Sequence, residues 1–441
     1  MLRKVGIMLF LVLLFFGGVA QEKERMVLSL KQAQEYALEN NLNRKNAELE
    51  VDKANKKVWE TTAMGLPQVT GEANLQYRLD DIPLVPFGPP DPNDPDEKPT
   101  LIPLGEKTSG TYGLTATQLI FSGPYIVGLR ASKAYKQLSE LSLEKTDVEL
   151  KSGIATAYYL VLLIAQSKAI LDSSANNITT VIDHTQKMYD VGFVDDVTVD
   201  QFKLAGSTIE NKRLEVAAQL NNAKNLLKYQ IGLPMSVDLE LTDSYDAFIG
   251  GMNQLQYENG KLELERSIDV RILENQVKLN SLDLARQKTE FLPSLAAFFT
   301  YQEQFNEPAI NFNPKMMVGL SLSVPIFSSG QRLSKVQQAK ISLNQSQNSL
   351  ELVRYALSMD YADALNSYRT LYSMYESAKV NRELAARVYK NIMLKYTKGM
   401  ASETDVIQAN DKHLEAEGNF VQAAYDLLNA KLKLDKILSL L

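Results

Sequence analysis

The chain contains one short pattern twice, as "KMYDVGFVDDVTVDQFKL" at 187–204 and "LKYTKGMASETDVIQAND" at 394–411. Tyr189 matches Tyr396 and Gly192 matches Gly399, and 207 positions separate the members of each pair. Glycine in this setting is typical of a position that ends a helix or needs a positive φ. The stretch therefore predicts two equivalent helical turns in a chain that is internally duplicated.

The segments around these turns have the composition of very long helices. All 15 prolines lie outside 1–66, 125–233 and 326–441, and proline disrupts helix interiors. An apolar seam with a period of seven, typical of supercoiled helices, runs along the second copy. Its members are Val336, Leu343, Leu350, Leu357, Ala364, Leu371, Ala378, Ala385 and Ile392. At 1.5 Å per residue, such a helix would be roughly 95 Å long, too long for a compact globule.

A second stripe follows the first at an offset of four residues. Its members are Tyr361, Tyr368, Tyr375, Tyr389 and Tyr396, with Arg382 in the remaining position. Packing between neighbouring helices is one explanation for these tyrosines. The lining of an aqueous passage is the other.

Four short segments alternate apolar and polar residues: 69–79, 111–118, 295–304 and 316–324. The third is less regular, because Phe298 lies on its polar face. Strands of this length and pattern are typical of a transmembrane β-barrel, although a half-buried soluble sheet has the same alternation. Four strands are too few to close a barrel, so several chains would have to contribute to one.

Two further segments interrupt these patterns. Residues 80–107 are acidic and rich in proline, which predicts an exposed loop outside the membrane rather than strand or helix. Residues 233–264 contain Pro234, Gly250, Gly251 and Gly260 and join the two copies. Their composition by itself is consistent with a plain linker.

The N-terminus has the features of a signal peptide at 1–20: a basic start, an apolar run and small residues before Gln21. A retained membrane anchor is the alternative. We expect no later segment to cross a bilayer as a helix. The formal charge of −6 gives no reason to expect a nucleic-acid partner.

Catalytic signatures are missing from the sequence. The chain has no cysteine, and its two histidines, His184 and His413, form no metal-binding motif. Both are expected on the surface or between helices. We predict that the protein is not an enzyme and that it needs no cofactor or metal.

Taken together, these features resemble the TolC-like outer-membrane efflux family. The resemblance rests on the order of helices and strands, the repeat, and local motifs. Those motifs are "ALENN" at 37–41, Leu-Pro before each first strand, "VPIFSSGQR" at 324–332, and the two Tyr-x-x-Gly turns. It implies a homotrimer in which twelve strands form one barrel in outer-membrane lipid and twelve helices form a periplasmic tunnel. It also implies a periplasmic membrane-fusion adaptor and an inner-membrane pump as partners.

The resemblance also suggests roles for residues of the turns, which would lie at the periplasmic entrance. Asp405 and Gln408 fall at a constriction of the pore, and Tyr396 matches a tyrosine that holds the entrance closed. Thr198 and Ala401 stand where ionic partners occur in the family, so the usual closed-state lock is not expected. A ring of Asp405 carboxylates would raise their apparent pKa by mutual repulsion; the alternative is that Asp405 only caps its helix.

The predicted fold class is mainly α with a transmembrane β part. After the signal peptide, we expect a periplasmic helix at 21–66, two strands at 67–123, a helical hairpin at 124–232, and an equatorial segment at 233–264. A second periplasmic helix follows at 265–292, then two strands at 293–327 and a second hairpin at 328–441. The predicted function is a passive outer-membrane duct for efflux of small molecules or a secreted polypeptide. The alternative is a secreted periplasmic coiled-coil scaffold with a small soluble sheet.

Overall fold

A computed structural model describes residues 25–88, 100–103, 105–255, 257, 260–305 and 314–440. The predicted signal peptide at 1–20 lies outside them. The chain divides into two compact units, which we describe separately. The first comprises Met1–Ala47, Leu143–Ile268 and Tyr355–Leu441, and the second comprises Glu48–Ser142 and Asp269–Arg354.

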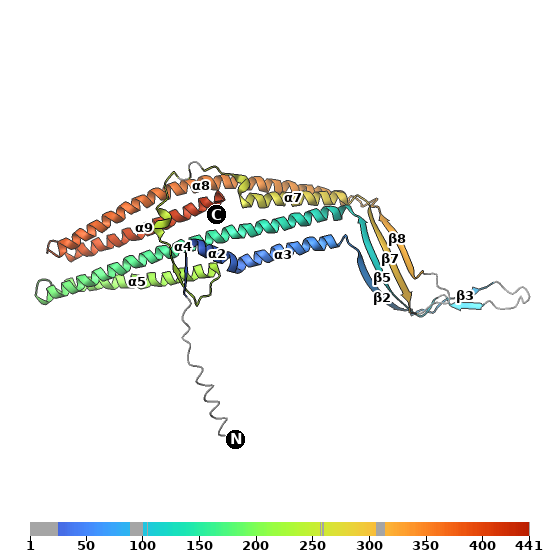
Figure 1. Ribbon diagram of the computed structural model, residues 1–441, viewed down its shortest axis with the longest axis horizontal. Helices are drawn as coiled ribbons and strands as arrows, with labels where there is room; N and C mark the ends of the chain where they lie inside the picture. Colours follow the sequence, from blue (N-terminus) through green and yellow to red (C-terminus); the bar gives the residue numbers. More distant parts are fainter. Residues whose placement is uncertain are drawn as a thin grey trace, which may run out of the picture. The chain divides into compact units, whose positions relative to one another are not determined.

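Four long helices form two hairpins (Figure 1). The first pairs α4 (Gly123–Asp190, 68 residues) with α5 (Asp196–Ile231), and the second pairs α8 (Gln331–Tyr396, 66 residues) with α9 (Glu403–Ile437). By length and composition alone, α4 contains a stretch apolar enough to cross a membrane, contrary to our expectation. A packed core helix can meet the same criteria, and 44% of that stretch is buried within the chain.

The tyrosine stripe of α8 faces the core of the first unit. Tyr368 and Tyr375 are buried, and the Tyr368 hydroxyl donates to the Asn253 carbonyl at 3.0 Å. Arg382, which interrupts the stripe, lies 4.3 Å from the centre of the Phe420 ring. Within one chain, these contacts favour interhelical packing over the lining of a passage for this stripe.

The segment that joins the two copies is folded into the first unit. It contains β6 (Asp238–Leu241), α6 (Tyr245–Ile249) and the 3-10 turn η1 (Leu264–Arg266). β6 pairs in parallel with β1 (Arg25–Leu28), a pairing that the sequence did not predict. Leu239, Tyr245 and Ile249 enter the core, so the described part of this segment packs into the unit and is not a plain linker.

The range 21–66, expected as one helix, contains β1 and two helices, α2 (Leu30–Asn40) and α3 (Leu42–Ala63). Asn41 has an extended backbone and separates them. Its side chain donates to the Gln230 carbonyl at 2.7 Å and accepts from the Arg44 N–H at 3.1 Å. Because the side chain of asparagine competes for backbone partners, it favours a break at this position.

The second unit contains the four predicted strands in one antiparallel sheet. They are β2 (Gln68–Tyr77), β5 (Thr108–Phe121), β7 (Ser294–Gln304) and β8 (Met316–Ser323), in the order β2-β5-β7-β8. Val69, Ala116, Phe299 and Val318 form one row across all four strands. The predicted apolar residues therefore share a face, as alternation requires.

Phe298, the exception to the alternation, has a local explanation. It lies opposite Gly319 on the other face of the sheet. A Cβ at Gly319 would come within 2.7 Å of the Phe298 ring. The missing side chain therefore makes room for the ring, and the pair departs from the polar pattern without disturbing the register.

The proline-rich segment also differs from expectation. Within 80–107, β3 (Leu84–Phe87) and β4 (Thr100–Pro103) form a separate antiparallel pair. Proline is tolerated in such strands because each has an unpaired edge. Residues 89–99 and 104 of the expected loop lie outside the described residues.

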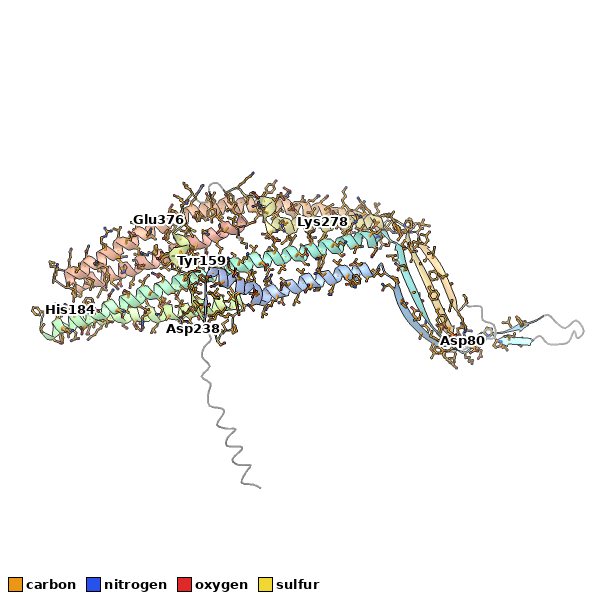
Figure 2. The ribbon with its side chains drawn as sticks, in the orientation of Figure 1. Asp80, Tyr159, His184, Asp238, Lys278 and Glu376 are labelled. Atoms are coloured by element: carbon orange, nitrogen blue, oxygen red, sulfur yellow. The ribbon has the colours of Figure 1, made fainter. Side chains whose placement is uncertain are left out.

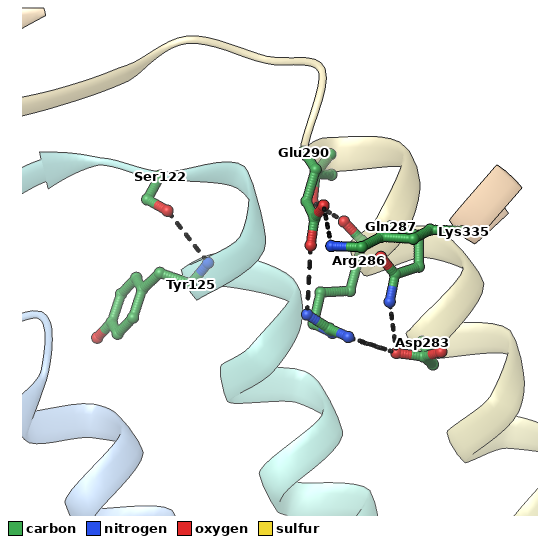
Figure 3. A network of polar contacts seen from close by, with 8 residues as sticks. Ser122, Tyr125, Asp283, Arg286, Gln287, Glu290 and Lys335 are labelled. Carbon is green, nitrogen blue, oxygen red and sulfur yellow. Dashed lines mark hydrogen bonds and ion pairs between the residues drawn. The ribbon is translucent and has the colours of Figure 1, made fainter. Parts of the chain in front are cut away.

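The strands of the second unit are followed or preceded by helices. α7 (Ile268–Thr289) precedes β7, and its C-terminal end carries a charge network, shown in Figure 3. Arg286 pairs with Asp283 at 2.9 Å, while Glu290 lies 3.6 Å from both Arg286 and Lys335. Basic side chains near a helix C-terminus also interact favourably with the helix dipole and so stabilise the helix.

Candidate functional site

The two duplicated turns have the same backbone geometry. Gly192 and Gly399 have φ of 78° and 71°, which favours glycine. Each glycine N–H donates at 2.9 Å to the tyrosine carbonyl three residues earlier, Tyr189 or Tyr396. The duplicated sequence pattern thus produces one helix-ending turn at two places.

The N-caps of the two helices that follow the turns use the same two kinds of side chain, a carboxylate and a hydroxyl, in exchanged positions. Before α5, the Asp195 carboxylate accepts from the Thr198 N–H at 2.9 Å and the Thr198 hydroxyl at 2.7 Å. Before α9, Ser402 is the N-cap, and Asp405 completes a capping box. Asp195 matches Ser402, and Thr198 matches Asp405, at the offset of 207. Both turns keep one carboxylate and one hydroxyl, but in opposite positions.

Asp405 caps its helix in the single chain. Its Oδ2 accepts from the Ser402 N–H at 2.9 Å and the Ser402 hydroxyl at 2.8 Å. These two hydrogen bonds lower the pKa of Asp405 below its usual value, and the bond from the Ser402 backbone N–H has the larger effect. The predicted rise in its pKa concerns three carboxylates brought together by three copies, so it stays a prediction beside this lowering in the single chain. Asp405 and Gln408 are both exposed and lie one helical turn apart.

Tyr396 of α8 contacts both helices of the first hairpin. Its hydroxyl lies 3.0 Å from the buried Thr185 Oγ1 of α4. Its ring packs edge-on against Phe202 of α5 at 5.4 Å between centroids. Burial raises the pKa of Tyr396 above its usual value.

The matching tyrosine of the first copy is in a different environment. The exposed fraction of Tyr189 is 44%, against 8% for Tyr396. The nearby His184, labelled in Figure 2, is also exposed, whereas His413 stacks on Tyr389 at 5.6 Å. Of the predicted turn residues, Tyr396 is therefore the one enclosed between the hairpins.

Sequence reasoning missed some residues of this site. The spacing of Ser402 and Asp405 matches a capping box, so that signal was available. No signal indicated Thr185, because its pairing with Tyr396 depends on how two helices lie side by side. Across the described residues, no group of three or more His, Asp or Glu residues is arranged to hold a metal ion.

The family model described as "Outer membrane efflux protein" matches residues 34–233 and 260–439. The chain belongs to this outer-membrane efflux protein family. No curated protein matched the chain.

Solved structures show the same fold. The outer-membrane channel CmeC of Campylobacter jejuni is 17% identical with a TM-score of 0.69, covering 96% of this chain and 90% of its own. VceC of Vibrio cholerae is 15% identical with a TM-score of 0.69, covering 93% and 95%. MtrE of Neisseria gonorrhoeae, in an open state, is 17% identical with a TM-score of 0.71, covering 93% and 88%.

Family membership confirms the predicted fold class and the main functional prediction. This outer-membrane efflux protein is a duct of the outer membrane that extends into the periplasm. Its family is one of channels. The scaffold alternative is therefore not supported, and neither is a soluble role for the four-stranded sheet.

Proposed function

We propose that three copies of the chain form one channel. Each copy would give four strands to a twelve-stranded barrel and two helical hairpins to a periplasmic tunnel. The observation that carries the proposal is the sheet, in which β2 and β8 are each paired on one side only. Its apolar face, including Leu320 and Leu322, is exposed. Open strand edges in lipid leave backbone groups unpaired, and closure with other copies removes the edges.

Transport through this channel would be passive. An inner-membrane pump would supply the energy, and a periplasmic membrane-fusion adaptor would join the pump to the helical end. The cargo would be small molecules or a secreted polypeptide. We infer no catalytic step and no cofactor for the chain itself.

We further propose that Asp405 and Gln408 line the constriction at the periplasmic entrance. Their exposure on one side of α9, just after the Gly399 turn, supports this role. Rings of carboxylates in a pore favour cations. Tyr396 would hold the entrance in shape, with Gly192, Gly399, Tyr189 and Thr198 forming the rest of the two turns.

Membrane fractionation tests the channel. The protein is expected to stay with outer membranes after salt and carbonate washes and to have the mass of a trimer in mild detergent. Release by carbonate, or a stable monomer, would contradict the proposal. Crosslinking in intact cells, followed by mass spectrometry, is expected to recover an adaptor and a pump.

Recordings in planar bilayers test the constriction. Asp405→Asn is expected to reduce cation selectivity and weaken block by multivalent cations, because it removes one charge per chain from the ring. Asp195→Asn is the matched control, since it removes the other capping carboxylate. Thr198→Asp, at the position matching Asp405, is expected to strengthen both properties. If Asp405→Asn changes only thermal stability, as a lost cap would, the constriction role is wrong.

A further inference from the structure

The first unit carries two grooves that the internal repeat makes equivalent. One lies between α4 and α5 and is lined by Ser167, Ile170, Leu171, Thr208 and Lys212, among others. The other lies between α8 and α9 and is lined by the residues 207 positions later: Met374, Ser377, Ala378, Glu415 and Asn419. Both grooves therefore occupy the same place on their hairpins.

The two grooves differ in what covers them. In the α4–α5 groove, α9 completes the lining through Asp411, Leu414 and Gly418. The α8–α9 groove has a volume of about 780 Å³, and all its described lining residues belong to α8 and α9 themselves. The second groove thus lacks the helix that covers the first.

The repeat also identifies the surface that would cover the open groove. The residues 207 positions before Asp411, Leu414 and Gly418 are Leu204, Ser207 and Asn211, which lie on α5. All three are exposed, and Leu204 has an exposed fraction of 71%. A single exposed leucine is common on protein surfaces. The repeat is what singles this one out, because it lies on the face of α5 that matches the covering face of α9.

We propose that α5 of a second copy of this chain occupies the α8–α9 groove, through its Leu204, Ser207 and Asn211. The proposal rests on the proposed trimer and adds the register of its helical contacts. The contact is head-to-tail, since each copy offers its α5 to one neighbour and its groove to the other. Such contacts form a closed ring when the rotation between copies fits a cyclic symmetry.

The repeat predicts specific pairs across this contact. Within the chain, the buried Ser174 Oγ donates to Asn410 Oδ1 at 3.2 Å. The corresponding pair between copies is Asn381, which lines the open groove, and Lys203, which is exposed. These two positions should therefore approach each other as closely as Ser174 and Asn410 do.

The same relation explains the exposure of Tyr189. Tyr396 contacts Thr185 and Phe202 within the chain. The positions matching those two partners are Ile392 and Ala409 of the second hairpin. Tyr189 should therefore pack its ring against Ile392 and Ala409 of a second copy, in a contact that is apolar and does not depend on its hydroxyl.

Introduced cysteines test the register, because the chain has none of its own. The full-length variant Lys203→Cys with Asn381→Cys is purified in mild detergent and treated with a mild oxidant or a short thiol crosslinker. Denaturing gels are expected to show species of two and three chain masses, since the pair would meet at every contact between copies. Ser174→Cys with Asn410→Cys is the matched control and should crosslink within one chain, with no increase in mass.

Single variants complete the design. Lys203→Cys and Asn381→Cys chains, produced together, should give crosslinked dimers and no larger species, because each chain carries one thiol. If native trimers form and the intrachain control reacts, but Lys203→Cys with Asn381→Cys stays monomeric on denaturing gels, the register is wrong and the trimer stands. If no trimer forms in the unmodified protein, the proposed function itself fails.

Discussion

Tyr396 and Tyr189 occupy the same position in the two copies but have different surroundings. Tyr396 is enclosed because α4 and α5 lie against it in the same chain, with Thr185 supplying a hydroxyl. Tyr189 is 44% exposed in the single chain, and the contact proposed above would give it a neighbour from a second copy. The duplicated chain supplies the partners of Tyr396 itself but leaves Tyr189 exposed. Two equivalent sequence positions therefore have different surroundings.

The Tyr396 contact gives a residue-scale prediction. Tyr396→Phe and Thr185→Val should each lower the free energy of unfolding by about 1 kcal/mol, the usual net contribution of one hydrogen bond. The double variant should lose little more than either single variant, because both remove the same bond. Denaturant unfolding of the purified protein measures all three.

Tyr189→Phe is the control for this experiment. It removes the hydroxyl from the matching position, where we expect only the ring to pack, so its stability should be unchanged. Strictly additive losses in the Tyr396 and Thr185 variants would show that the two side chains do not act as a pair.

At the scale of the element, the turns depend on backbone conformation more than on packing. A Cβ at Gly192 or Gly399 would have open space around it, yet both residues have positive φ. Gly192→Ala and Gly399→Ala should therefore each destabilise the protein by about 1 kcal/mol through backbone strain alone. Thermal unfolding followed by circular dichroism measures the change.

Gly128→Ala is the opposite case. Gly128 lies within α4, also with open space, but without a positive φ. Alanine there should stabilise the helix by about 0.5–1 kcal/mol. A similar effect of alanine at all three glycines would contradict the assigned role of the turns.

The faces of β8 give a second element-scale prediction. Leu320 and Leu322 pair with Ala297 and Leu295 on the apolar face, while Ser321 and Ser323 lie on the other. Lysine at Leu320 and Leu322 together should block assembly, since each charge facing lipid at mid-bilayer costs about 2–4 kcal/mol. Native gels of membrane extracts measure the yield of trimer.

Lysine at both Ser321 and Ser323 is the matched control, with the same added charge on the opposite face. This variant should assemble normally. A normal yield from the Leu320 and Leu322 variant would instead mean that this face does not contact lipid.

For the molecule as a whole, buried tyrosines make the helical unit sensitive to alkaline pH. Burial raises the pKa of Tyr159, Tyr368 and Tyr375 to about 12. Below the unfolded pKa of about 10, their contribution to stability is fully present. As the pH rises from about 10 towards 12, the unfolded chain releases protons that the folded chain retains, so stability should fall.

Unfolding midpoints measured between pH 8 and pH 12 test this prediction. The midpoint should be nearly constant up to about pH 10 and then decrease. Tyr368→Phe should lower stability at pH 8, because it loses the bond to the Asn253 carbonyl, but should reduce the dependence on alkaline pH. An unchanged dependence in this variant would show that Tyr368 does not contribute to it.

Much of this protein follows from sequence periodicity. The absence of proline permitted α4, α5, α8 and α9, and the period of seven predicted α8, because helix propensity and a repeating apolar seam act locally. Alternation predicted the four strands and their shared apolar face for the same reason. The duplicated Tyr-x-x-Gly pattern predicted both turns, since a positive φ strongly favours glycine.

Only the tertiary structure decided the contacts between distant segments. The pairing of β1 with β6, the break at Asn41 and the partnership of Tyr396 with Thr185 each join residues far apart in the chain. The sequence also left open whether 233–264 is a linker and whether the tyrosine stripe lines a passage. Those answers depend on which surfaces pack against each other in the folded chain. The burial of a side chain is set by all of its neighbours together, and a local sequence pattern does not specify those neighbours.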